Sequence, residues 1–341
     1  MKQNLKVWVL ASLLLAIAHR PAAAAINVKL ATLAPEGSIW DQSVKEMGAE
    51  WQQATGGRVQ LRVYPGGVAG DEPDVVRKMR IGQLHAAVLT VSGLTDIDEA
   101  FEVFTIPLFF DSYDELYYVL DKLRPTFEQR LQAKGYQLLS WGNGGWVHLF
   151  STKPLPTVAD LKASKLFVAA GDDERVQWWQ NNGFRPVALA TTDVLTGLQT
   201  GMIEAMPSPP LAALLLQWYR QAPYMLDLGV APLVGATVIT SKVWQQIAPA
   251  DQAAILAAAK KVEERLNAEV PEQDRKSIAE MQKRQLTVVP VPADAAKSWE
   301  AAAEEFANNV RNTRVPPEVL QQALAARAEY RKAHPAGGAE P

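Results

Sequence analysis

The chain contains no cysteine, although it is long enough for two domains. Its four histidines are isolated, and none has a second histidine or a cysteine at the spacing that a zinc site needs. No Gly-x-Ser-x-Gly, phosphate-binding loop or dinucleotide-binding glycine pattern follows a predicted strand. These absences argue against a disulfide-stabilised fold, a metal centre and an enzyme. We expect no catalytic residue, no metal and no cofactor.

Long apolar runs are absent from the chain except near its N-terminus. Val7–Ala18 follows Lys2 and Lys6 and precedes the small-residue stretch Pro21–Ala25, an order typical of a cleaved signal peptide. The run is too short to span a bilayer, although a retained anchor is the alternative interpretation. We therefore predict removal of residues 1–25 and a free periplasmic protein, since no cysteine is available for lipid attachment.

The chain also has no excess of positive charge. The formal net charge is −3. Loss of Lys2, Lys6 and Arg20 with the signal peptide lowers it by three, to −6. Because no basic region remains, nucleic acid is not expected as a partner.

Strand and helix patterns alternate along the rest of the chain, which predicts an α/β fold. The clearest unit is Leu161–Pro209. It contains a strand over Lys165–Ala169, helices that end at Gly183 and Gly201, and a strand over Met202–Met206. This order is typical of a crossover unit in a parallel sheet, and such sheets bind ligands beyond the carboxyl ends of their strands.

Two segments carry signals that interrupt regular structure. Pro271 predicts a kink or break in a helix that begins at Pro249 and resumes to about Arg284. Gly142–Gly145 predicts a loop between strands over Tyr136–Trp141 and Trp146–Ser151. The tryptophans that flank this loop, Trp141 and Trp146, are therefore candidates for a pocket.

Five motifs in matching order resemble the substrate-binding proteins of TRAP transporters, the DctP-type periplasmic receptors, over about Ile26 to Val291. These motifs are Lys29–Ser38, Val63–Gly67 with Gly70, Ile106–Phe110, Leu195–Gly201, and Trp244 with Pro249–Gln252. The resemblance implies a two-lobed periplasmic-binding-protein clamshell. Each lobe is then a mixed sheet flanked by helices, and hinge strands and a long helix cross both lobes.

The resemblance also implies a function and a domain organisation. The protein would capture a small-molecule solute between its lobes and deliver it to the small and large subunits of a TRAP membrane permease, acting as a monomer. Lobe I would span residues 26–149, with about 236–270 returning to it. Lobe II would span residues 150–235, with about 271–332 packing on it, and 333–341 would be a disordered tail.

The resemblance places ten residues at the solute site. They are Trp40, Glu72, Thr90, Ser92, Asn143, Trp146, Phe167, Ala170, Ser208 and Trp218. In the family, an arginine on the strand matching Lys165–Ala169 pairs with the solute carboxylate. Here Phe167 occupies that position, Trp146 replaces a second arginine, and Ser208 replaces an asparagine.

These replacements bear on the chemistry of the ligand. Burial of an unpaired carboxylate is costly, whereas aromatic side chains suit apolar surface. We therefore predict an apolar, aromatic or neutral solute rather than a small dicarboxylate. The alternative is an acid held by a relocated cation, with Lys165, Arg175 and Arg185 as candidates.

Two other functions stay open at this point. The same clamshell could serve as a sensing module or as a shuttle that passes a lipid or another apolar ligand to a partner protein. A periplasmic enzyme is the second alternative, and no nucleophile with a base in reach supports it.

Overall fold

The computed structural model describes residues 25–335. Residues 1–24 and 336–341, which hold most of the predicted signal peptide and of the predicted tail, lie outside the described range. Between residues 25 and 335, no helix has the length and the apolar character that a membrane span requires.

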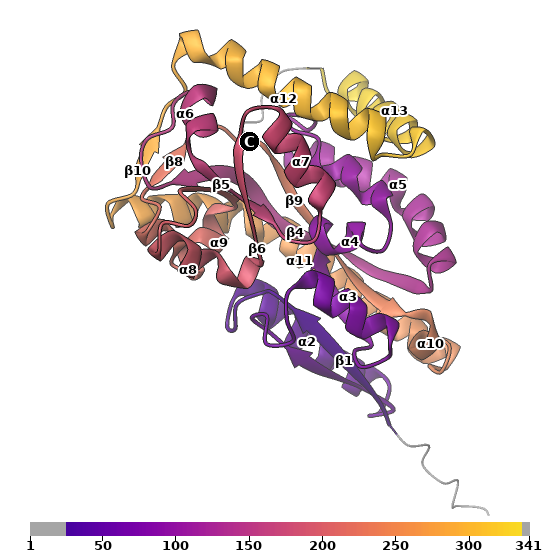
Figure 1. Ribbon diagram of the computed structural model, residues 1–341. Helices are drawn as coiled ribbons and strands as arrows, with labels where there is room; N and C mark the ends of the chain where they lie inside the picture. The colour runs from indigo at the N-terminus through magenta and orange to yellow at the C-terminus, as the bar shows by residue number, and fades with distance from the viewer. Residues whose placement is uncertain (1–24, 336–341) are drawn as a thin grey trace, which may run out of the picture.

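All strands belong to one network, in which the long strand β4 is shared by two sheets (Figure 1). The strands are β1 (Ile26–Thr32), β2 (Val59–Tyr64), β3 (Ala86–Thr90), β4 (Tyr136–Ser151), β5 (Lys165–Ala169), β6 (Arg185–Leu189), β7 (Ala205–Ser208), β8 (Tyr224–Leu226), β9 (Ala231–Thr240) and β10 (Thr287–Val289). Their order is β2-β1-β3-β9-β4-β7-β5-β6, and β8 pairs with both β4 and β10.

The helices cover both sheets. The α-helices are α2 (Ile39–Ala54), α3 (Glu72–Arg80), α4 (Val91–Thr95), α5 (Tyr113–Ala133), α6 (Val158–Ala163), α7 (Asp173–Asn181), α8 (Val194–Gln199), α9 (Pro210–Leu215), α10 (Ser241–Trp244), α11 (Pro249–Gln282), α12 (Ala293–Thr313) and α13 (Pro317–Ala333). Short 3₁₀ helices are η1 (Glu99–Thr105), η2 (Thr191–Asp193) and η3 (Trp218–Arg220).

The two sheets define two lobes, which confirms the predicted α/β clamshell. In lobe I, β1 pairs in parallel with β2 and β3, and β9 runs antiparallel between β3 and β4. In lobe II, the end of β4 pairs with β7 and β8, and β5 pairs in parallel with β6 and β7. Each lobe is thus a mixed sheet with its own core, around Trp51 and Phe127 in lobe I and around Phe150 and Trp299 in lobe II.

The predicted loop over Gly142–Gly145 is wrong, because β4 continues through it. The pairing of β4 with β9 shifts register between Asn143 and Trp146, which is a β-bulge rather than a chain reversal. Gly145 has a φ of 105°, a conformation that glycine adopts without strain. The bulge lies just before the point where β4 leaves β9 and joins β7 at His148.

Of the kink or break predicted at Pro271, the break does not occur, because α11 is continuous through the proline. Pro271 has no N–H, so the carbonyl of Asn267, four residues earlier, loses its usual helical partner. The Tyr117 hydroxyl donates to that carbonyl at 3.0 Å and restores the hydrogen bond from outside the helix. Ile255 lies in the core of lobe I and Met281 in the core of lobe II, so α11 crosses both lobes.

The crossover unit of lobe II contains a strand that the sequence pattern did not indicate. β5 has the predicted bounds, but β6 lies between α7 and α8. Pro186 argues against a central strand, yet β6 is the outermost strand, where a missing N–H is tolerated.

The C-terminal helices return to lobe I. Trp299 at the middle of α12 packs in lobe II, whereas Phe306 packs in the main core of lobe I. Val319 and Ala323 of α13 join the same lobe I core, and α13 lies beside α5 in Figure 1. Residues from Met281 to Trp299 thus pack on lobe II as expected, whereas Phe306 and α13 pack on lobe I, because α13 directs its apolar face to α5.

We expect Tyr117→Phe to lower the free energy of unfolding by about 1–2 kcal/mol, because the half-buried carbonyl of Asn267 then has no partner and the buried Asn143 Nδ2 loses its acceptor. In a Pro271→Ala background the restored N–H can bond to Asn267, so the same substitution should cost less. Urea unfolding of the four proteins measures the difference. An equal cost in both backgrounds would show that the phenol does not replace the missing helical hydrogen bond.

Candidate functional site

The two lobes meet at loops that follow the carboxyl ends of their strands. Asp71, at the start of α3 in lobe I, accepts a hydrogen bond from the Thr191 N–H of lobe II at 2.7 Å. Next to it, the Gly171 backbone faces Pro73. The strand ends of both sheets therefore border one interlobe region, as the crossover pattern predicts.

Asn143 links Trp40, another predicted site residue, to the bulge of β4. It is 3% exposed, and its carbonyl accepts from the Trp40 Nε1 at 2.9 Å. Its side-chain Nδ2 donates to the Tyr117 hydroxyl at 2.6 Å, and its Oδ1 accepts from Gly145 N at 3.0 Å. Asn143 thus fixes the indole of Trp40 and the shape of the bulge through its own polar atoms.

Trp146 stands on the same bulge and is held by a buried carboxylate. Its indole is 6% exposed and meets the Tyr113 ring edge to face, at a centroid distance of 5.2 Å. Its backbone N–H donates to Asp274 Oδ2 at 3.0 Å. The indole Nε1 has no hydrogen-bond partner within residues 25–335.

Asp274 is a residue that the sequence pattern did not single out. On α11, its Oδ1 accepts from Leu211 N at 3.0 Å, and its Oδ2 also accepts from the Tyr113 hydroxyl at 3.3 Å. Burial raises the pKa of Asp274 to about 6. The sequence did contain a signal for Asp274, because its acidic side chain falls on the apolar, buried face of α11 between Val270 and Met281.

Glu72, Thr90 and Ser92 are brought together where β3 runs into α4. The Glu72 carboxylate accepts from Thr90 N at 2.6 Å, from the Thr90 hydroxyl at 2.7 Å and from Gly93 N at 2.9 Å. Burial raises the pKa of Glu72 to about 7, against the effect of these hydrogen bonds. Glu72 therefore organises the start of α4, and the exposed Ser92 is the member of this group that faces solvent.

The predicted residues of lobe II have an apolar setting. Phe167 packs against the core cluster that contains Trp218, and it lies in register with Val187 on β6. Ser208 is buried, and its hydroxyl donates to Pro209 O at 3.0 Å. Ala170 follows β5 and donates its N–H to Leu189 O at 2.9 Å.

Trp141 is not a pocket residue. Its indole is buried and meets the rings of Phe101, Phe104 and Phe127 edge to face. The expectation rested on a loop after Trp141, and the continuous strand β4 places it in the core of lobe I instead.

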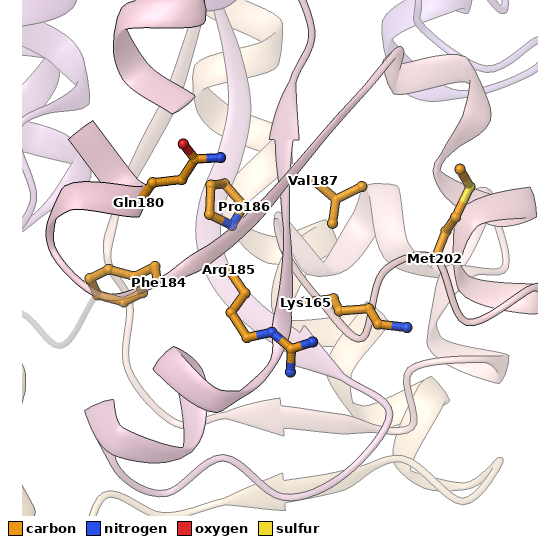
Figure 2. A pocket seen from close by; sticks show the side chains of 7 residues that line it. All are labelled: Lys165, Gln180, Phe184, Arg185, Pro186, Val187 and Met202. Carbon is orange, nitrogen blue, oxygen red and sulfur yellow. The ribbon is translucent and has the colours of Figure 1, made fainter. Parts of the chain in front are cut away.

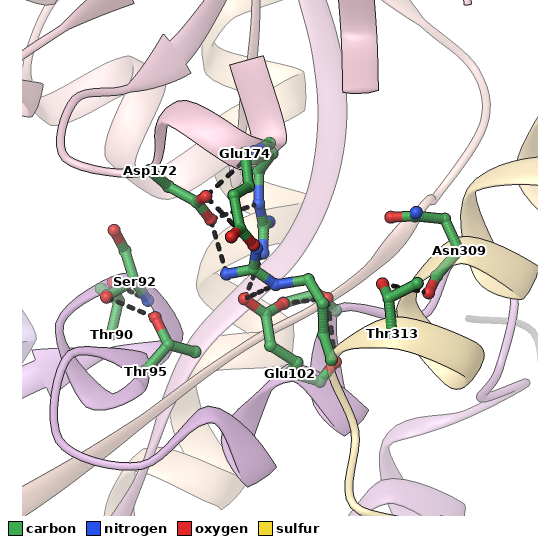
Figure 3. Close-up of polar contacts among 11 residues, drawn as sticks. Thr90, Ser92, Thr95, Glu102, Asp172, Glu174, Asn309 and Thr313 are labelled. Carbon is green, nitrogen blue, oxygen red and sulfur yellow. Dashed lines mark hydrogen bonds and ion pairs between the residues drawn. The ribbon is translucent and has the colours of Figure 1, made fainter. Parts of the chain in front are cut away.

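The first candidate for a relocated cation, Arg175, is already paired with carboxylates. It contacts Glu102 of lobe I and lies 3.2 Å from Asp172. Figure 3 labels these two acidic residues. Arg314 joins the same network, at 2.8 Å from Asp172 and 3.3 Å from Glu102. Asp172 also begins α7 as its N-cap, as expected for a carboxylate at a helix N-terminus.

The other two candidates lie beside the outer edge of lobe II. Lys165 Nζ donates to Gly201 O at 2.7 Å, and Arg185 Nη1 donates to Ala163 O at 2.9 Å. Figure 2 shows both at a cavity of about 480 Å³ that Val187 and Met202 also line. They stand at the amino ends of β5 and β6, opposite the ends that border the interlobe region.

Fold and site together define a two-lobed solute-binding protein. Residues 30–313 match the family model of the bacterial extracellular solute-binding proteins, family 7 (DctP). The chain belongs to this family, whose members and structural neighbours are receptors rather than enzymes.

Curated relatives are similar over part of their length. A solute-binding protein of Chromohalobacter salexigens is 27% identical over 227 residues, which cover 66% of each chain. The sialic acid-binding periplasmic protein SiaP of Vibrio cholerae is 21% identical over 254 residues, 73% of this chain and 79% of that protein. For the first three relatives, the matched region spans 66%, 49% and 65% of their own length.

Solved structures show the same fold over nearly their whole length. DctP7 of Bordetella pertussis, a receptor binding pyroglutamic acid, superposes with a TM-score of 0.82 at 21% identity, covering 89% of this chain and 100% of that one. A TRAP solute-binding protein of Xanthobacter autotrophicus with bound β-D-galacturonate gives 0.81 at 19% identity, with 88% and 99% covered. The solutes of both carry a carboxylate.

We expect Glu72 to make the protein more stable as the pH falls from about 7 to about 5. The folded protein keeps the Glu72 proton up to about pH 7, whereas the unfolded chain releases it near 4.5. The folded form therefore binds more protons in this window, and its stability falls as the pH rises. The difference in unfolding free energy between the unchanged protein and Glu72→Gln should change by about 2.5 kcal/mol between pH 5 and pH 8.

Urea unfolding at three pH values checks this expectation, with the exposed Glu99→Gln as a matched control. The pKa of Asp274 is also raised, so Asp274 likewise makes the protein less stable as the pH rises. Part of the pH dependence of stability should therefore remain in Glu72→Gln. Parallel curves for Glu72→Gln and the unchanged protein would contradict the expectation.

Proposed function

We propose that this protein is the periplasmic solute receptor of a TRAP transport system. Membership of the family and the two-lobed fold support this proposal. The signal peptide would direct export, the solute would bind between the lobes, and the closed monomer would deliver it to the small and large permease subunits. The ligand favours closure because it contacts both lobes at once.

The proposed site takes its surface from both lobes. Lobe I contributes Trp40, Thr90, Ser92 and the bulge with Trp146. Lobe II contributes four residues, which are Phe167, Ala170, Ser208 and Trp218. Asn143 and Glu72 belong to the site as positioning residues, because their polar atoms bind the protein's own groups. We propose that lobe I comprises residues 26–149 and about 236–270, and that lobe II comprises residues 150–235.

The solute proposed for this site is apolar, aromatic or neutral where it meets Phe167 and Trp146. The observation that carries this proposal is the pairing of Arg175 with Glu102 and Asp172, which leaves this arginine without free charge for an acid. At Trp146 the carboxylate of Asp274 accepts from the backbone N–H. A buried carboxylate of the solute would therefore meet aromatic surface and a like charge.

The acids bound by the relatives make charge the property to test. Matched pairs in which one member lacks the negative charge, such as galacturonate and its methyl ester, separate the two ligand classes in thermal-shift titrations. Native mass spectrometry of the purified protein identifies a co-purifying compound. We expect the neutral members to stabilise the protein. Saturable stabilisation by the acids but not by their esters would overturn the proposed ligand class and leave the receptor role intact.

A guanidinium at position 167 should oppose binding of a neutral solute. We expect Phe167→Arg to weaken affinity for the stabilising compound at least tenfold, which corresponds to about 1.4 kcal/mol. Phe167→Leu keeps an apolar side chain and should change affinity only a few-fold. Isothermal titration calorimetry measures both, and thermal melting confirms that both variants fold. Unchanged binding by Phe167→Arg would place this position outside the site.

A further inference from the structure

The outermost strands of the two lobes end at loops that touch each other. β2 and β6 stand at opposite ends of the strand order. Yet the loop after β2 and the loop after β6 meet, and the Asp71 carboxylate accepts from Thr191 N across the contact. We call these two segments, residues 65–71 and residues 190–192 at the start of η2, the lips of the interlobe region.

The lips fit closely. A Cβ placed on Gly67 would lie 2.7 Å from Thr192 Cγ2, a separation that real side chains do not reach. Gly67 also has a φ of 76°, so glycine suits both the backbone and the approach of the opposite lip. The contact is therefore a fitted one, and it exists only when the lobes are together.

Asp71 makes this contact in place of a local one. It occupies the N-cap position of α3, where an aspartate ordinarily accepts from the amides of the first turn. Its side chain makes no such bond, and its second oxygen, Oδ1, is buried without a partner among the described residues. In this structure the Asp71 side chain therefore bonds across the interlobe contact and not within its own helix.

We propose that the hydrogen bond from Thr191 to Asp71 is a latch that favours the closed form without contacting the solute. This inference rests on the proposed function, because a latch matters only if the lobes open and close. Asp71 is then a positioning residue. It shifts the ratio of closed to open protein and, with it, the rate at which solute leaves, while the solute-contacting surface stays unchanged.

Thr191→Pro removes the latch with little other change. Thr191 is the first residue of η2, where the N–H has no helical partner and proline is favoured. Ala190 before it has φ −63° and ψ 144°, the extended conformation that a following proline requires. Thr191→Ala is the matched control, because it removes the same side chain and keeps the N–H. Asp71→Ser removes the opposite partner and retains a residue that caps α3.

The absence of cysteine allows two fluorophores to be placed without further changes. Ile81→Cys in lobe I and Met202→Cys in lobe II, at positions 61% and 51% exposed, report the distance between the lobes by single-molecule energy transfer. Without solute, we expect Thr191→Pro and Asp71→Ser each to raise the open-to-closed ratio about tenfold over Thr191→Ala. The double variant should add little to either single change.

Equal distance distributions for Thr191→Pro and Thr191→Ala would overturn the latch. If the distributions still hold two populations, the clamshell motion of the proposed function survives that result. One distance common to every variant would instead reject both the latch and the motion.

Discussion

The carboxylate of Asp274 joins the parts of the molecule on which its two-lobed form depends. It accepts from β4 at the bulge, from the start of α9 and from the Tyr113 hydroxyl of α5, while its own helix, α11, crosses both lobes. A Cβ on Gly145 would lie 2.4 Å from this carboxylate, so the bulge and the acid are fitted to each other. The bulge lies on β4, the strand that both sheets share, so this one carboxylate is bonded where the two sheets join.

Local patterns were sufficient for much of this fold. The strand predicted over Lys165–Ala169 matches β5 at both ends. The errors occurred where a partner distant in sequence satisfies what the local signal lacks. Asn267 recovers its hydrogen bond from Tyr117, so Pro271 does not break α11. Pro186 is tolerated for a different reason, since no strand within residues 25–335 pairs beyond β6.

For the candidate site, the sequence named positions but not the interactions that their side chains make. The resemblance named Glu72 and Asn143, but their polar atoms turned out to bind Thr90, Gly93 and Tyr117. Such pairings join residues far apart in the chain, and no spacing rule reports them. From the sequence, Arg175 was a candidate for an unpaired positive charge. In the structure it pairs with two carboxylates, those of Glu102 and Asp172.

The return of α13 to lobe I has a consequence for the order of folding. The main core of lobe I draws on residues from Ala31 to Ala326, whereas the cores of lobe II use residues between Leu149 and Trp299. A chain made from its N-terminus therefore holds all of lobe II before lobe I has its last helix. Contacts of such long sequence separation form slowly. The lobe that begins first along the chain is thus the lobe that can be completed last.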